Sequence, residues 1–276
     1  MSSIQIKTNK WNEWLAGVID GDGYFYINKK EKSVSFEITT HVMDAKLLYN
    51  IKNTLGGGSV KLRANTQSVR YRVKQSDIII NVLNRVNGKL YNQRRIGQFH
   101  AACALKNITP IQSPPLITNQ SAYLAGLIDS DGAITLGVSK TSPEHSILSG
   151  VEGKIQRLIH SRGHHQLTLK VSGSHKDTIE ILRHSYGFGM ISTANPDKKS
   201  KTTKSQYIWV LCKYEEFALI FEQLKRYPLR SVKMHRIRLT PIYFKYKQLN
   251  YHCSKKGSPE FKQWEKFCRL WHKYSY

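Results

Sequence analysis

A nonapeptide that occurs twice constrains the fold of this chain more than any other sequence feature. Residues 15–23 read LAGVIDGDG and residues 124–132 read LAGLIDSDG, so seven of nine positions are identical at an offset of 109. A second likeness follows, because the helix, glycine turn and strand expected over residues 42–60 recur over residues 173–191. Self-similarity on this scale predicts two structurally related halves joined in one chain.

The second half contains sequence that the first half lacks. The offset between matching positions grows from 109 to 131 across residues 140–165, which marks an inserted segment. Residues 107–120 carry three of the eight prolines and no charged residue, a composition typical of a semi-rigid linker. We therefore expect an N-terminal half over residues 1–106 and a C-terminal half over residues 121–276. Within the latter, residues 240–276 form a tail with apolar residues near helical spacing, which we expect to pack on that half.

Each half is predicted to run helix, two strands, helix, two strands, helix. The first helix is expected over residues 10–20 and again over residues 119–129, and the residues just before them, Asn9 and Thr118, are N-cap types. Between residues 58 and 74, apolar side chains alternate with basic ones. One face of an antiparallel sheet would then be apolar and the other cationic.

The charge balance indicates a polyanionic partner. The chain has 43 Lys and Arg against 19 Asp and Glu, a formal net charge of +24. In the first half, five basic residues fall on the polar face of two strands, where like charges repel unless an anion neutralises them. These residues are Lys61, Arg63, Arg70, Arg72 and Lys74. Nucleic acid is the first candidate and an anionic membrane surface the alternative; no apolar run approaches the ~20 residues of a transmembrane helix.

The acidic residues of the repeat predict a shared metal site. Small residues in both motifs remove the side chains that would hold two helix backbones apart, and these are Ala16, Gly17, Ala125 and Gly126. Helices packed side by side about a pseudo-twofold axis would bring Asp22 and Asp131 together at their C-terminal ends. Adjacent carboxylates at the negative ends of two helix dipoles repel, and a divalent cation removes that cost. Carboxylate and carbonyl oxygens suit Mg²⁺ or Mn²⁺ and argue against zinc.

The two motifs resemble the signature of the LAGLIDADG homing endonucleases, in the single-chain form with two motifs. The resemblance reaches to about Leu239. It implies an α+β fold of two pseudo-twofold-related αββαββα halves whose antiparallel sheets form a DNA-binding saddle. It also implies a monomeric DNA endonuclease, a phosphodiester hydrolase that uses Mg²⁺ to cut each strand of a long target once and leave 3′ overhangs.

The resemblance assigns roles to individual motif residues. Asp22 and Asp131 would bind metal and act in catalysis, and the carbonyl groups of Gly21 and Ser130 would complete the metal shell. The preceding acidic residues, Asp20 and Asp129, would instead structure the helix ends.

Basic side chains near each scissile phosphate are a further property of the family. Arg94 and Lys233 occupy corresponding places in the two halves, although a one-residue gap would substitute Arg95 for Arg94. Strand parity adds contacts to DNA from outward-facing residues. Besides the basic row, these are Tyr24, Tyr26, Asn28, Glu37 and Thr39 in the first half and Thr135, Thr168 and Lys170 in the second.

Two rival functions remain open for such a chain. The first is a maturase that binds a group I intron RNA to assist splicing, and the second is a DNA-binding regulator without catalysis. Both acidic motif residues are present, which favours cleavage, since a protein that only bound nucleic acid would have no physical need for them. The resemblance suggests an intron-encoded protein of a mitochondrion or chloroplast, with a bacterial or archaeal cytoplasm as the alternative. The N-terminal segment resembles neither a signal peptide nor a presequence, so we expect the protein to act where it is made.

Overall fold

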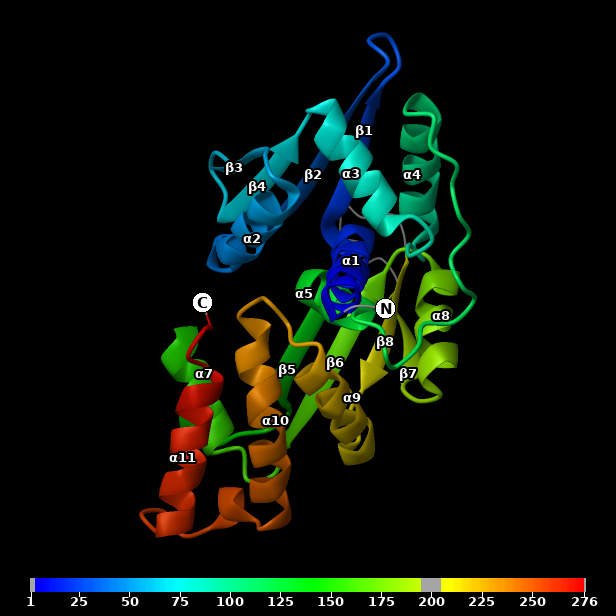
Figure 1. The fold of residues 1–276 in the computed structure, drawn as a ribbon. Coiled ribbons are helices and arrows are strands. Elements are labelled where there is room, and N and C mark those ends of the chain that lie inside the picture. The colour runs from blue at the N-terminus through cyan, green and yellow to red at the C-terminus, as the bar shows by residue number, and fades with distance from the viewer. Residues whose placement is uncertain (1–2, 195–204, 276) are drawn as a thin grey trace. The chain divides into compact units, whose positions relative to one another are not determined.

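The computed structural model describes residues 3–194 and 205–275 (Figure 1). The elements related to the first motif are α1 (Ser3–Asp22), β1 (Gly23–Asn28), β2 (Ser33–His41), η1 (Val42–Asp44), α2 (Ala45–Leu55), β3 (Ser59–Leu62), β4 (Ser68–Val73), α3 (Ser76–Val86) and α4 (Gln93–Leu105). Those that follow the linker are α5 (Tyr123–Asp131), β5 (Gly132–Val138), α6 (Pro143–Ser146), α7 (Gly150–Ile159), β6 (His165–Gly173), α8 (Lys176–Tyr186), β7 (Met190–Ala194), β8 (Gln206–Leu211), α9 (Tyr214–Arg226), α10 (Lys233–Gln248), η2 (Tyr251–Cys253) and α11 (Pro259–Trp271). The α+β class and the order of the elements are as predicted, with additional helices in both halves.

The first sheet is antiparallel, with strand order β1–β2–β4–β3. Its apolar face is buried under α2 and α3 (Figure 1), where Phe25, Phe36 and Tyr71 are at most 1% exposed. Alternation in β4 places Val69, Tyr71 and Val73 inward and the intervening arginines outward, as the sequence pattern predicts. Leu62 is an exception, because it is 70% exposed at the end of the edge strand β3.

The second sheet has strand order β5–β6–β8–β7. Leu167, Leu169 and Val171 of β6 are at most 1% exposed and form the apolar row that alternation predicts. β7 pairs antiparallel with β8, and Ile191 lies opposite Trp209. Trp209 is fully buried, and its Nε1–H donates to the Phe188 carbonyl oxygen at 3.0 Å.

The chain divides into two compact units. The first comprises the described residues of Met1–Gly132, Lys170–Val210 and Gln223–Ser231, and the second those of Ala133–Leu169, Leu211–Glu222 and Val232–Tyr276. The units therefore differ from the sequence halves, because both motif helices and the whole first sheet lie in the first unit. None of the described helices combines the length and hydrophobicity needed to cross a lipid bilayer.

The motif helices have different boundaries from those predicted. α1 begins at Ser3, so Asn9 lies within the helix, and α5 begins at Tyr123 after an Ala122 N-cap, so Thr118 lies before it. The predicted N-caps were therefore wrong. Both helices also continue two residues further than predicted, which places the complete Asp-x-Asp sequence of each motif in helical conformation.

The insertion and the tail pack together in the second unit. The insertion contains α6 and α7, and the tail contains the end of α10, which continues through Pro241, followed by α11. Trp264 of α11 is fully buried, and its Nε1–H donates to the Ile159 carbonyl oxygen at 3.2 Å. Arg269 of α11 also forms an ion pair with Glu152 of α7 at 3.3 Å. The extra sequence of the second half is therefore one helical layer built from two separate segments.

Candidate metal and nucleic-acid site

The two motif helices are in backbone contact. A Cβ atom on Gly17 would lie 2.1 Å from the Tyr123 carbonyl oxygen, and one on Gly126 would lie 1.9 Å from the Trp14 carbonyl oxygen. Real Cβ atoms do not approach oxygen so closely, so only glycine permits this separation of the helices. The small residues of the repeat therefore act as predicted.

The C-terminal ends of α1 and α5 converge. A Cβ atom on Gly21 would lie 2.1 Å from Ser130 Oγ and 3.2 Å from the carboxyl carbon of Asp131. Ser130 Oγ in turn donates to the carbonyl oxygens of Gly126 and Leu127, at 3.1 Å each. The residue before each predicted metal ligand thus lies against the other motif, and the Asp22 and Asp131 side chains are partly buried where the helices meet.

Asp20 is a buried anchor for the first helix end. Its Oδ2 atom accepts the backbone N–H groups of Tyr91 and Asn92 at 2.6 and 3.1 Å. The Tyr123 hydroxyl, which belongs to the other motif helix, donates to the same oxygen at 2.7 Å. Burial raises the pKa of Asp20 to about 6 despite these hydrogen bonds, which lower it.

Asp129 has the equivalent arrangement in the second motif. It accepts the backbone N–H groups of Arg230 and Ser231, at 2.9 and 3.0 Å, and the Trp14 indole N–H at 2.8 Å. Burial raises its pKa, and the hydrogen bonds from Ser231, Arg230 and Trp14 oppose that shift. Each anchor therefore joins its own helix to the opposite motif helix and to the loop before a closing helix, which supports the structural role predicted for this pair.

Arg95, and not Arg94, contacts the first motif. Its Nη2 donates to the Gly21 carbonyl oxygen at 3.0 Å, and its Nε donates to that of Ile19 at 3.2 Å. Burial and the neighbouring Arg94 lower the pKa of Arg95, whereas the carboxylates of Asp20, Asp131 and Asp22 oppose that decrease. Arg94 is exposed on α4. Lys233 is the first residue of α10 and is partly buried in the second unit.

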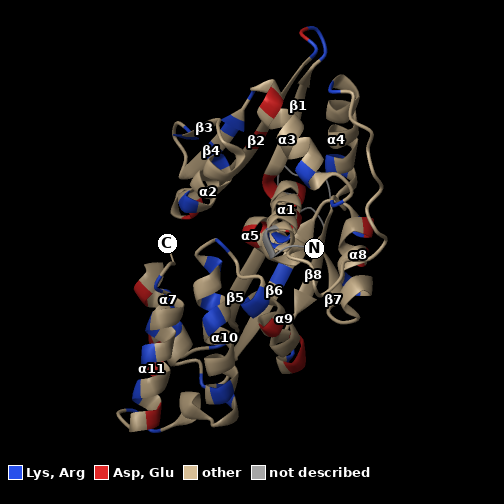
Figure 2. Ribbon diagram, in the orientation of Figure 1, with Lys and Arg blue, Asp and Glu red and all other residues tan. Residues whose placement is uncertain are grey.

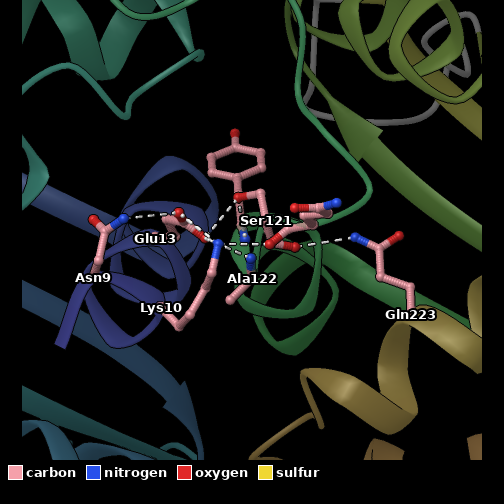
Figure 3. A network of polar contacts seen from close by, with 8 residues as sticks. Asn9, Lys10, Glu13, Ser121, Ala122 and Gln223 are labelled. Atoms are coloured by element: carbon pink, nitrogen blue, oxygen red, sulfur yellow. Dashed lines mark hydrogen bonds and ion pairs between the residues drawn. The ribbon is translucent and has the colours of Figure 1, made fainter. Parts of the chain in front are cut away.

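A network of polar contacts joins α1 to the residues just before α5, at the end of the helix pair away from Asp22 and Asp131 (Figure 3). Glu13 of α1 accepts the Ala122 backbone N–H at 2.8 Å and the Ser121 hydroxyl at 3.1 Å, directly before α5 begins. Lys10 bonds to Glu13 at 3.1 Å and donates to the Gln120 carbonyl oxygen at 2.6 Å. The N-cap residue Ala122 has no side chain that could accept a hydrogen bond. Ser121 Oγ accepts the Tyr123 backbone N–H at 3.1 Å instead, and Glu13 adds an acceptor from the other motif helix.

The polar face of the first sheet carries the residues predicted to contact DNA. Across the strands, Tyr24 lies opposite Glu37 and Glu37 opposite Arg72, while Arg70 lies between Thr39 and Lys61. Tyr24 and Tyr26 are 39% and 51% exposed on this face. The remaining members of the row have partly or fully exposed side chains, and these are Asn28, Arg63 and Lys74.

Glu37 has an electrostatic role that alternation alone did not show. It forms ion pairs with both Arg70, at 3.2 Å, and Arg72. The predicted repulsion among the five basic residues is therefore relieved in part within the protein, while Lys61, Arg63 and Lys74 remain exposed. Figure 2 shows basic residues on the elements of this sheet.

In the second sheet, Thr135 of β5 and Thr168 of β6 share a hydrogen bond of 2.8 Å between their hydroxyl groups. Lys170, two residues further along β6, has an exposed side chain. This face is less basic than that of the first sheet, as the sequence indicates.

The motif ends offer oxygen donors for a hard cation. Among the described residues, no group of three or more His, Cys, Asp or Glu side chains could hold a metal ion. Two carboxylates together with the carbonyl groups of Gly21 and Ser130 fit Mg²⁺ or Mn²⁺ by donor chemistry. The Gly21 carbonyl oxygen already accepts a hydrogen bond from Arg95, so the carboxylates of Asp22 and Asp131 would be the main donors to such an ion.

Sequence reasoning missed several residues that build this site. Trp14 and Tyr123 occupy the same position in the two motifs, but an aromatic residue in a helix gives no local sign of a polar contact with a distant carboxylate. The role of Glu13 depends on a contact across 109 positions, which no local pattern reveals. Arg95 could have been preferred over Arg94 only by knowing the helical phase of α4.

Comparisons with known proteins agree with these features. A family model described as LAGLIDADG endonuclease matches residues 15–103. The chain is 30% identical over 267 residues to the probable intron-encoded endonuclease aI2 of Debaryomyces hansenii, covering 96% of this chain and 38% of that protein. It is also 30% identical over 262 residues to the intron-encoded RNA maturase bI4 of Saccharomyces cerevisiae, covering 95% of this chain and 36% of that protein. The chain thus spans well under half the length of these two relatives.

A solved structure shares the fold. The I-SmaMI LAGLIDADG homing endonuclease, in a crystal structure bound to cleaved DNA, matches with a TM-score of 0.58 over 92% of this chain and 95% of that chain. The sequence identity is 17%.

Proposed function

Since this chain belongs to the LAGLIDADG endonuclease family, we propose that it is a site-specific homing endonuclease that cuts both strands of a long DNA duplex. The observation that carries the proposal is the convergence of the two motif ends, where Gly21 lies against Ser130 and Asp131. This contact supports two acidic groups acting at one place, as cleavage of two nearby phosphodiesters requires.

Asp22 and Asp131, with the carbonyl groups of Gly21 and Ser130, would hold Mg²⁺ or Mn²⁺. When bound, such an ion lowers the pKa of a water molecule and stabilises charge that develops on the phosphoryl oxygens. The protein itself contributes by holding the two carboxylates in place. The buried anchors Asp20 and Asp129 fix the helix ends, so the two carboxylates require little reorganisation when the substrate arrives.

Arg95 is the basic residue that we assign to the first motif in place of Arg94. Its guanidinium group is held by the carbonyl oxygens of Ile19 and Gly21, and this places positive charge beside the two acidic residues. A cation there would favour a phosphate approaching the carboxylates. In the second half, Lys233 remains our candidate for the corresponding role.

The polar faces of the two sheets would bind the duplex. Exposed lysine and arginine side chains would contact phosphates and guanine, and Tyr24, Tyr26 and the threonines would add contacts to base edges or sugars. Binding would release many counterions from the DNA, so the affinity of the protein for DNA would fall steeply as the salt concentration rises.

Purified protein offers a direct test of the nuclease. With Mg²⁺ and a library of long duplexes, it should cut both strands and leave 3′ overhangs. Asp22→Asn or Asp131→Asn should reduce cutting by at least the about 100-fold that marks the upper end for losing a residue that merely orients a metal ligand. Glu31→Gln is a matched control, because it removes one acidic charge at an exposed site in the loop between β1 and β2. Full cutting by both motif variants would reject the site.

A maturase is the second candidate, because one relative that matches 95% of this chain is named an RNA maturase. Splicing assistance requires binding to a group I intron RNA but no cleavage of DNA. A protein with this function alone would retain RNA binding, and show no metal-dependent cutting, in the same assay. We further propose that the protein is a monomer encoded within an intron and acts in a mitochondrion or chloroplast.

A further inference from the structure

A pocket lies between the start of α9 and the second half of α10, within the second compact unit. Its volume is about 790 Å³, and its lining residues belong to two short segments, 212–215 and 241–248. On α10 most of them recur at spacings of three and four residues, which places them on one side of the helix. These residues are Pro241, Phe244, Lys245 and Gln248. Tyr243 lies on a different side, since its ring is buried and its hydroxyl shares a hydrogen bond of 3.1 Å with His165 of β6. The pocket therefore lies among the helices on the apolar side of the second sheet and not on the polar face of its strands.

Two aromatic residues line this pocket, and one of them is open to solvent. The ring of Phe244 has its centre 5.1 Å from that of Tyr243, 5.5 Å from that of Phe217 and 5.3 Å from that of Tyr214. Tyr243 and Phe217 are at most 2% exposed, whereas Tyr214 is 58% exposed. Tyr214 is thus supported by a packed ring and still presents much of its own surface. An aromatic ring presented in this way can stack on a nucleobase.

The backbone that carries Tyr214 is held in place by a buried carboxylate. Glu216 Oε2 accepts the backbone N–H groups of Cys212 and Lys213 at 2.9 and 3.0 Å. These hydrogen bonds fix the chain between the end of β8 and the first turn of α9. Less ordering of this segment is then required when a ligand binds, which favours affinity.

Three lysines accompany the aromatic pair. Lys213, Lys245 and Lys247 line the pocket with exposed side chains, and Figure 2 shows basic residues along α10. Glu215 is the one acidic residue among the described residues that line the pocket. Proteins that bind single-stranded nucleic acid combine stacking rings with cationic groups, because each base has a phosphate on either side. The bases of a duplex are already stacked on one another, so a duplex offers no free base face to Tyr214.

The other polar side chains of the pocket favour RNA over DNA. The Glu215 carboxylate accepts hydrogen bonds, and the Gln248 amide both donates and accepts them. A ribose 2′-hydroxyl group can donate to the first and bond in either sense to the second, and DNA lacks this group. A volume of about 790 Å³ lies within the range of small-molecule sites, so it accommodates one nucleotide.

We propose that this pocket binds an unpaired nucleotide of single-stranded RNA, with its base stacked on Tyr214 and the neighbouring phosphates close to the three lysines. The inference goes beyond the proposed nuclease, because it requires neither a metal ion nor a DNA duplex. It gives the RNA-binding candidate function a defined point of contact, since unpaired bases in RNA loops are available for stacking.

The test measures binding to the full chain in the absence of Mg²⁺. The probe is a short fluorescent RNA without internal base pairs, and fluorescence anisotropy gives its affinity. A DNA strand of the same sequence and a long duplex of mixed sequence are the comparison ligands. Tyr214→Ala removes the exposed ring, and Tyr214→Phe retains it. Tyr49→Ala is a matched control, because Tyr49 is 48% exposed on α2 and lies outside the pocket.

Tyr214→Ala should weaken RNA binding by about 5-fold to about 150-fold, the range for loss of one stacked base. Tyr214→Phe and Tyr49→Ala should bind RNA as the unchanged protein does, and Tyr214→Ala should retain its affinity for the duplex. Lys213→Gln with Lys245→Gln should make the salt slope of RNA binding shallower by about 0.7 for each lost phosphate contact. Lys262→Gln with Lys266→Gln, which removes two exposed charges of α11 outside the pocket, should change this slope less. The lysine variants keep the test decisive if loss of the Tyr214 ring disturbs packing on Phe244.

Equal RNA affinities of Tyr214→Ala and Tyr49→Ala, together with equal salt slopes of the two lysine variants, would overturn the proposal. An equal loss of duplex and RNA affinity in Tyr214→Ala would also overturn it, because the ring would then not act on unpaired bases. Equal affinities for the RNA and for the DNA strand would overturn the assignment to RNA. The expected RNA binding in a protein that never cuts DNA would reject only the nuclease.

Discussion

Replacing Gly126 by alanine tests the backbone contact on which the candidate site depends. The new Cβ would lie 1.9 Å from the Trp14 carbonyl oxygen and 2.9 Å from the Val18 backbone nitrogen. Because both neighbours are backbone atoms within a helix, neither can rotate away, and α1 and α5 must separate instead. Gly97, in the exposed middle of α4, is a matched control, since a Cβ there would have no neighbour within 4 Å.

The two substitutions should change stability in opposite directions. Alanine is favoured over glycine within a helix by about 1 kcal/mol, so Gly97→Ala should raise the free energy of unfolding by about that amount. At Gly126 the same gain is opposed by overpacking, which costs about 1–3 kcal/mol in a well-packed interior. Because the new methyl group would meet backbone atoms that cannot rotate, we take the upper end of this range of overpacking costs. The free energy of unfolding should then fall by about 2 kcal/mol.

Urea denaturation followed by circular dichroism would measure both values, and cleavage assays would report on the site. Gly126→Ala should also reduce cutting strongly, because separated helix ends no longer present Asp22 and Asp131 together. Gly97→Ala should cut normally. If Gly126→Ala were as stable as the control variant, the motif helices could not be in the close contact described, and Asp22 and Asp131 would not share one site.

Two further predictions concern charge. Glu37→Gln frees Arg70 and Arg72 for phosphates, so the salt slope for binding to duplexes of mixed sequence should steepen by up to about 1.8, or 0.9 for each new contact; a change no larger than that of Glu31→Gln would contradict this role. Burial lowers the pKa of His165 from 6.5 to about 3, so the neutral ring stabilises the fold above pH 6.5, and stability should fall as the pH drops below that value. His165→Gln should flatten this fall in urea denaturation between about pH 7 and pH 5, and an unchanged pH dependence would show that another group is responsible.

Local pattern and repetition allowed much of the fold to be predicted. Alternation gave the correct faces of β4 and β6, because a strand with one buried face must alternate, and the spacing of Phe261, Trp264 and Trp271 correctly indicated a tail helix. Helix starts were predicted poorly. Asn9 has the chemistry of an N-cap, but α1 continues through it, since an asparagine within a helix is only mildly unfavourable.

The parts of the site that could not be predicted depend on contacts between distant segments. The ion pairs of Glu37 require the register of β2 with β4, and the cap from Glu13 requires the packing of α1 on α5. The choice between Arg94 and Arg95 depends on which side of α4 faces the motif, and two adjacent basic residues give no periodic signal. The helical layer of the second unit combines two segments absent from the repeat, so self-similarity could not indicate it.

The two motifs carry different residues, Gly21 and Ser130, where their helix ends lie against each other. This difference limits which halves can be combined. Gly21 has room only for hydrogen opposite Ser130, because a Cβ there would lie 2.1 Å from the serine oxygen. A homodimer of two second halves would place serine against serine at this position and could not close to the same distance. Chimaeras made by exchanging halves between related genes should therefore keep this separation of the motif helices only when a half that carries serine here is combined with one that carries glycine.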